Sequence, residues 1–199
     1  MDSSVRVSTH GKVLLLTLEN PSGYPRLERD VLATLIQRVQ FAIHQPRVRG
    51  VVITGTEHAF ATGAEMDEIA RLTPIAAHDF SLLGQRLMKM IERSQKPIVA
   101  AIRGYCFGGG LDLALGCHAR VASEDARFAH PGGRLGILTG WGGTQRLPRL
   151  LGRARTLEMF CTGQVIPALE ALAMGLINRI VEQDQVVQCS IQLAGEPEP

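Results

Sequence analysis

Three consecutive glycines followed by an acid form the segment of this chain best suited to chemistry. Gly108-Gly109-Gly110 lies between a buried apolar run at 98–102 and a short apolar segment at 111–115, which contains Asp112. Without β-carbons, the backbone N–H groups of such a bend can approach a ligand closely. A helix that starts there adds unpaired N–H groups and the positive end of its dipole. The bend therefore suits a developing oxyanion, although glycines can also serve packing alone.

Other common site patterns are weaker. No Gly-Lys-Ser/Thr follows the triplet and the G-x-G-x-x-G spacing is missing, which disfavours a nucleotide-phosphate loop. The four cysteines form no C-x-x-C pair, so neither a structural metal nor a redox dithiol is expected. A second glycine-bearing loop, HAFATGAEM at 58–66, follows a short β-branched run at 50–55. Taken alone, this loop is an ordinary surface connection.

Composition excludes several classes of function. The chain has 199 residues, 45% hydrophobic and 5% aromatic, with a net charge of +2. These values favour neither nucleic-acid binding nor attraction to an anionic membrane. No window reaches the ~20 apolar residues of a membrane span, and the polar N-terminus lacks a signal-peptide core. We expect a cytoplasmic protein without nucleic-acid or membrane partners.

The segments that must position these loops alternate between two patterns of apolar residues, one typical of strands and one typical of helices. Continuous apolar runs at 13–18, 50–55 and 98–102 and the segment around Val121 are typical of buried strands. Apolar residues at three- to four-residue spacing predict helices over 27–43 and 80–91, and helical patterns broken by glycines fill 142–180. Strands alternating with helices predict an α/β fold with one domain over 1–199.

Four segments, in order along the chain, carry a resemblance to a known family. They are HAFATGAEM, GYCFGGGLDLALGCHARVA, RFAHPGGRLGILTGWGGTQRL and ALEALAMGLINRIV. They resemble the A-F-x-A-G-A-D, G-x-x-x-G-G-G-x-E-L-A, F-x-x-P-E…G-G-T-Q-R-L and A-x-x-x-G-L-V segments of the crotonase (enoyl-CoA hydratase/isomerase) superfamily. The resemblance covers about residues 5–185. It implies a crotonase-like spiral of repeated ββα turns, a short tail over 186–199 and a truncated C-terminal helical segment.

The resemblance also implies roles for particular residues. The backbone N–H groups of Ala64 and Gly109 would hold a thioester oxyanion, and Asp112 would be the catalytic acid/base. The family's substrate-binding positions match Ala61, Gly63, Phe107, Gly108, His130, Pro131, Gly132 and Trp141. The coenzyme A portion would meet Tyr24, Arg26 and Ala61. Coenzyme A would enter as part of the acyl-CoA thioester, with no other cofactor and no metal. A homo-oligomer, a trimer or a dimer of trimers, is implied as well.

The chain departs from the family pattern at its second catalytic carboxylate. Hydratases of the family hold water between two glutamates, and the second position matches Gly132 here. No acid lies near Gly140 or Trp141 either, and His130 is the nearest titratable substitute, unless it is only a polar loop residue. One carboxylate can still shuttle one proton. Hydratase or isomerase chemistry on an enoyl-CoA is therefore predicted, and a decarboxylase or lyase branch or a catalytically silent CoA-binding scaffold remain alternatives.

Overall fold

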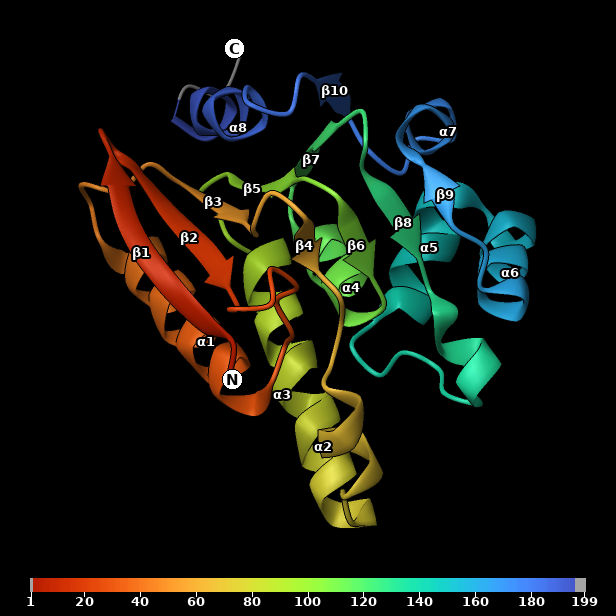
Figure 1. Cartoon of the computed structure of the whole chain (residues 1–199). Helices are drawn as coiled ribbons and strands as arrows, with labels where there is room; N and C mark the ends of the chain where they lie inside the picture. The colour runs from red at the N-terminus through yellow and green to blue at the C-terminus, as the bar shows by residue number, and fades with distance from the viewer. Residues whose placement is uncertain (1, 196–199) are drawn as a thin grey trace.

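The computed structural model describes residues 2–195, which build two sheets with helices packed against them (Figure 1). The first sheet has the strand order β1-β2-β3-β5-β7-β10. Its strands are β1 (Ser4–His10), β2 (Val13–Glu19), β3 (Gly50–Thr54), β5 (Ile98–Ile102), β7 (Ala119–Ser123) and β10 (Arg179–Val181). The β1–β2 pair is antiparallel and all other neighbours are parallel.

The second sheet runs in the order β4-β6-β8-β9. Its strands are β4 (Ala59–Ala61), β6 (Tyr105–Phe107), β8 (Arg127–Ala129) and β9 (Ile166–Pro167). Each of β3, β5 and β7 passes directly into a strand of this sheet, and a helical segment follows each time. This repeated order confirms the predicted α/β spiral of ββα turns. It also places the two glycine-bearing bends at the ends of the adjacent strands β4 and β6.

Helices occupy both faces of the first sheet, which explains its continuous apolar strands. Alternate residues of β2 face opposite sides: Leu14 and Leu16 belong to the main core with α1 (Arg29–His44) and α3 (Pro74–Glu92). Val13 and Leu15 belong to a second core with α8 (Val186–Gly195), which lies across the other face (Figure 1). The remaining helical segments are α2 (Met66–Ala70), α4 (Gly109–Gly116), η1 (Pro131–Leu135), α5 (Gly143–Leu151), α6 (Arg153–Thr162) and α7 (Ala168–Ala173).

The prediction of a short tail over 186–199 is wrong for residues 186–195. These residues form α8, whose Val186, Ser190 and Ala194 are buried against the sheet. The helix approaches so closely that a β-carbon on Gly50 would lie 2.1 Å from the carbonyl oxygen of Ala194. Residues 196–199 lie outside the described part of the chain. Within residues 2–195, no helix is both long and apolar enough to cross a bilayer.

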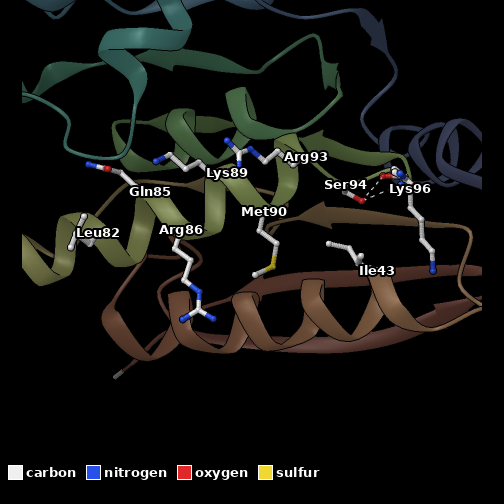
Figure 2. A pocket seen from close by; sticks show the side chains of 10 residues that line it. Ile43, Leu82, Gln85, Arg86, Lys89, Met90, Arg93, Ser94 and Lys96 are labelled. Atoms are coloured by element: carbon white, nitrogen blue, oxygen red, sulfur yellow. Dashed lines mark hydrogen bonds between the residues drawn. The ribbon is translucent and has the colours of Figure 1, made fainter.

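A basic groove lies between α1 and α3, and one of its side chains, Lys96, caps the C-terminal end of α1. The groove encloses about 750 Å³ and is lined by Arg86, Lys89, Arg93 and Lys96, with Met90 and Ile43 at its apolar wall (Figure 2). Lys96 reaches the C-terminal end of α1, where its ammonium donates 2.7 Å hydrogen bonds to the carbonyls of Ala42 and Gln45. The Gln45 carbonyl also accepts from the N–H of Val48, whereas the Ala42 carbonyl faces Pro46, which has no N–H to donate. A cation at this position therefore supplies a donor that the helix end lacks and offsets the negative end of the helix dipole.

Replacing Lys96 with methionine is therefore expected to lower the free energy of unfolding by about 1–2 kcal/mol, because two charge-assisted hydrogen bonds disappear. Lys89→Met is the matched control, since Lys89 is exposed in the same groove and its ammonium makes no hydrogen bond to the described residues. It should change stability by less than about 0.5 kcal/mol. Urea unfolding followed by circular dichroism measures both, and equal effects would contradict the capping role.

Candidate functional site

A mostly apolar cavity of about 240 Å³ opens where the two glycine-bearing bends meet. Side chains from α2, α3, α6 and the segment after β8 form its walls, among them Met66, Ile69, Phe80, Leu138 and Phe160. Eight of the thirteen predicted site residues line this cavity: Gly63, Ala64, Gly108, Gly109, His130, Pro131, Gly132 and Trp141. The structure therefore brings together loops that lie far apart in the sequence.

The two bends approach each other through glycines that adopt conformations closed to most residues. Gly63 has φ +100° and Gly108 has φ +52°, values that strain any L side chain. A β-carbon on Gly63 would lie 3.2 Å from the backbone nitrogen of Gly109, so the loops are nearly in contact. The first loop is tied down because the N–H of Leu27 donates to the Gly63 carbonyl over 2.8 Å.

Two backbone N–H groups at this contact have no partner in the described part of the chain. The neighbouring N–H of Gly108 donates to the carbonyl of Ala129, whereas those of Ala64 and Gly109 reach no protein acceptor. Gly109 is the first residue of α4, so its N–H is one of the orphan donors of a helix start. Two free donors on one cavity wall can stabilise an oxygen that gains negative charge.

Trp141 forms the wall beside these donors. A β-carbon on Gly109 would meet the indole at 2.3 Å, and one on Gly84 of α3 would meet it at the same distance. The indole N–H donates to the carbonyl of Phe80 over 3.3 Å, and the two rings pack edge to face. Glycine is thus required at 84 and 109 because the indole fills the space between α3 and α4, and the ring limits the room beside the bend.

Asp112 lies on α4, directly behind the cavity wall rather than in it. Its side chain is fully buried, and the Thr139 hydroxyl donates a hydrogen bond to Oδ2. Burial raises the pKa of Asp112 to about 7, although the Thr139 hydroxyl, the charge of Arg146 and the nearby amides of Gly143 and Trp141 favour the ionised form. Asp112 is thus poised to gain or lose a proton near neutral pH.

His130 stands between Asp112 and the cavity. Its Nε2 lies 3.5 Å from Asp112 Oδ1, and both atoms are enclosed without a hydrogen-bond partner. Burial lowers the pKa of His130 to about 4, so the imidazole is neutral at neutral pH. A β-carbon on Gly143 would lie 2.3 Å from Asp112 Oδ1, so glycine at 143 leaves the pair its space. Thr139 and Gly143 were not predicted as site residues.

No carboxylate fits at the position of Gly132. A β-carbon there would lie 2.7 Å from the carbonyl oxygen of Ile137, whose own N–H donates back to the Gly132 carbonyl over 2.9 Å. The backbone around η1 is therefore built for glycine. Among residues 2–195, no group of three His, Cys, Asp or Glu side chains is arranged to hold a metal ion.

Two predicted substrate contacts lie away from the cavity. Ala61 is covered by α4, because a β-carbon on Gly110 would meet the Ala61 carbonyl at 2.2 Å. The ring of Phe107 packs against Tyr105, its neighbour on the same face of β6, with 5.1 Å between centroids. Neither residue lines the 240 Å³ cavity, so direct contact of these two side chains with the reacting group is not supported.

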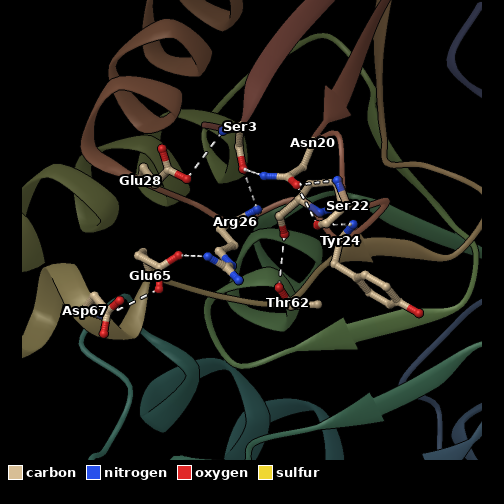
Figure 3. Close-up of polar contacts among 10 residues, drawn as sticks. Ser3, Asn20, Ser22, Tyr24, Arg26, Glu28, Thr62, Glu65 and Asp67 are labelled. Carbon is tan, nitrogen blue, oxygen red and sulfur yellow. Dashed lines mark hydrogen bonds and ion pairs between the residues drawn. The ribbon is translucent and has the colours of Figure 1, made fainter. Parts of the chain in front are cut away.

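Tyr24 and Arg26 also lie outside the cavity, beside the turn that contains Asn20 and Ser22 (Figure 3). Arg26 points toward Glu65 and forms an ion pair with it, while the Tyr24 ring points away from that pair. Tyr24 is 41% exposed, and its ring lies 6.2 Å from that of His58 and 6.1 Å from that of Tyr105. Tyr24 is thus available for stacking, whereas the charge of Arg26 is already compensated.

Comparisons with known proteins agree with this architecture. The family model for enoyl-CoA hydratase/isomerase matches residues 8–196. The chain is 34% identical to the short-chain-enoyl-CoA hydratase of Clostridium acetobutylicum, covering 98% of this chain and 75% of that protein. It is 35% identical to the crotonyl-CoA hydratase of Syntrophomonas wolfei, covering 92% and 71%. The crystal structure of an enoyl-CoA hydratase from Bacillus anthracis superposes with a TM-score of 0.89 at 32% identity, covering 98% and 76%.

Proposed function

The chain belongs to the enoyl-CoA hydratase/isomerase family of acyl-CoA-processing enzymes, and we propose that it converts an enoyl-CoA thioester through an enolate held by two loop amides. The observation that carries this proposal is the pair of unpartnered N–H groups, on Ala64 and Gly109, at one apolar cavity. A thioester carbonyl bound there would be polarised, which makes the α-carbon acidic and the β-carbon electrophilic.

The proton transfer is assigned to the buried acid behind the wall. Asp112, with a pKa near 7, can accept and return one proton at neutral pH. Moving a double bond along the acyl chain needs only one proton taken from one carbon and returned to another. Isomerisation of a 3-enoyl-CoA to the 2-enoyl-CoA is therefore the reaction that this site supports best.

Hydration of the 2-enoyl-CoA is the second candidate. It is favoured by the printed activities of the two relatives, a short-chain-enoyl-CoA hydratase and a crotonyl-CoA hydratase. The site argues against efficient hydration, because Gly132 has no room for a second carboxylate that would hold the water. We therefore expect the rate of isomerisation to exceed the rate of hydration.

The surroundings of the reaction are also part of the proposal. Coenzyme A would enter as part of the substrate, without a further cofactor, and the exposed Tyr24 ring would stack on its adenine. We propose a cytoplasmic homo-oligomer, a trimer or a dimer of trimers. Exposed apolar side chains outside the cavity lining, among them Ile75 at 77% and Leu169 at 75% exposure, support self-association. Light scattering after gel filtration measures the mass.

The proposed function is tested by incubating the purified protein with crotonyl-CoA and, separately, with a 3-enoyl-CoA in deuterium oxide. Absorbance follows the conjugated double bond, and mass spectrometry follows added water and deuterium. We expect formation of the 2-enoyl-CoA with deuterium incorporation, and slower hydration. Binding of both thioesters without turnover or exchange would contradict an enzymatic role and favour the silent CoA-binding alternative.

A further inference from the structure

The imidazole of His130 has two unlike nitrogens. Nε2 is enclosed, unpartnered and 3.5 Å from the equally unpartnered Oδ1 of Asp112. Nδ1 makes no hydrogen bond to the described residues either, yet it is not among the enclosed atoms. His130 also lines the cavity, and because Nε2 faces the acid, Nδ1 is the ring nitrogen left for a group bound there.

Asp112 itself has no face on the cavity. Its Oδ2 is occupied by the Thr139 hydroxyl, which in turn accepts from the N–H of Trp141 over 3.4 Å. The carboxylate is thus held so that only Oδ1 is free, and Oδ1 points at the histidine. Two groups that line the cavity therefore reach the carboxylate, the Thr139 hydroxyl at Oδ2 and the His130 imidazole at Oδ1. Of these, only the imidazole offers a basic nitrogen to a carbon-bound proton.

We infer that His130 is the group that exchanges a proton with the thioester, and that Asp112 is the buried partner that takes the ring's second proton. This inference rests on the proposed function and refines it, since the acid becomes a positioning and proton-storing residue. It also accounts for the missing second carboxylate, because a histidine two residues before Gly132 supplies the reactive atom.

The step balances within the site. In the base form, Asp112 is ionised, Nε2 carries the ring proton and the lone pair of Nδ1 faces the cavity. The α-carbon C–H bond breaks, its proton bonds to Nδ1, and its electron pair forms the enolate. The charge on the enolate oxygen is held by the amides of Ala64 and Gly109, while the Nε2 proton passes to Oδ1. The same transfers in reverse, at the γ-carbon, complete an isomerisation.

The charged and titratable neighbours agree with a pair that works at neutral pH. Burial raises the pKa of Asp112 and lowers that of His130, so the pair takes up its extra proton near pH 7. From α5, the charge of Arg146 favours the ionised acid. From β6, Cys106 faces the acid as a neutral thiol, because burial raises its pKa well above the ordinary value.

The test measures deuterium uptake at the α-carbon of a 3-enoyl-CoA, together with isomerisation, for the wild type and three variants. We expect His130→Gln to lower both rates by about 10²–10⁴-fold, the usual range for a lost acid/base, with binding of butyryl-CoA retained. Free imidazole should restore exchange in His130→Gly in a dose-dependent manner. His10→Gln is the control, because His10 lies on the exposed strand β1 outside the site; it should match the wild type.

The outcomes separate this inference from the proposed function. A wild-type protein that binds acyl-CoA but shows no exchange would overturn the proposed function. Exchange in the wild type with a His130→Gln rate within about threefold of it would overturn the inference, because proton transfer would then not need the imidazole. A purely structural role for His130 predicts that imidazole restores nothing, and that result would also overturn the inference.

Discussion

Replacing Ala64 with proline is expected to lower kcat for enoyl-CoA turnover by about 10²–10³-fold, the usual effect of losing one oxyanion donor. Proline has no N–H, and the N–H of Ala64 makes no hydrogen bond to the described residues. The fold therefore loses no backbone hydrogen bond at this position, while the site loses one of two donors. Initial rates and the Kd for butyryl-CoA, measured by calorimetry, separate catalysis from binding.

Ala64→Gly is the matched control for this variant. It also alters the side chain at 64, yet it keeps the N–H, so kcat should stay within a few-fold of the wild type. An equal loss in both variants would indicate that loop conformation or cavity shape, rather than the donor, sets the rate. A proline variant with wild-type kcat would remove Ala64 from the oxyanion site.

The strands that lead to the bends were predictable because a strand buried on both faces is a continuous run of apolar residues. The apolar run at 98–102 coincides with β5 in its bounds, and the run at 50–55 contains β3. β1 gave no such signal, because Ser4–His10 is mostly exposed and pairs only at the sheet edge. α8 was missed because the residues that it buries, such as Ser190 and Ala194, are small or polar.

In the site, too, the features set by local sequence were predictable, and those set by contacts between distant segments were not. The bends at Gly63 and Gly108 were predictable, since glycine spacing and the family resemblance place both of them. The pairing of Asp112 with Thr139, 27 residues later, was not, because it depends on the loop before α5 folding back over α4. Likewise, only the packing of α4 on β4 shows that Ala61 is covered.

The Asp112–His130 pair also predicts an unusual pH dependence of stability. Between about pH 4.5 and 6, folded His130 is neutral because burial lowers its pKa to about 4, while the unfolded chain binds a proton there. This contribution makes stability rise with pH, and it is lost as pH falls through 4. Folded Asp112 is protonated in the same window because burial raises its pKa to about 7, whereas the unfolded acid is ionised. That contribution is present at low pH and is lost as pH rises, so the two slopes cancel in the wild type.

Single variants should expose the two slopes with opposite signs. In Asp112→Asn only the histidine remains, so the free energy of unfolding should rise with pH by about 1.4 kcal/mol per unit more steeply than in the wild type. In His130→Gln it should fall by about the same amount per unit relative to the wild type. Urea unfolding at half-unit steps from pH 4.5 to 6 measures the slopes, with His10→Gln as the control for a surface histidine. Parallel curves of unfolding free energy against pH for all four proteins would mean that the acid and the imidazole do not titrate as a buried pair. The proposed proton path from the cavity to Asp112 would then lose its physical basis.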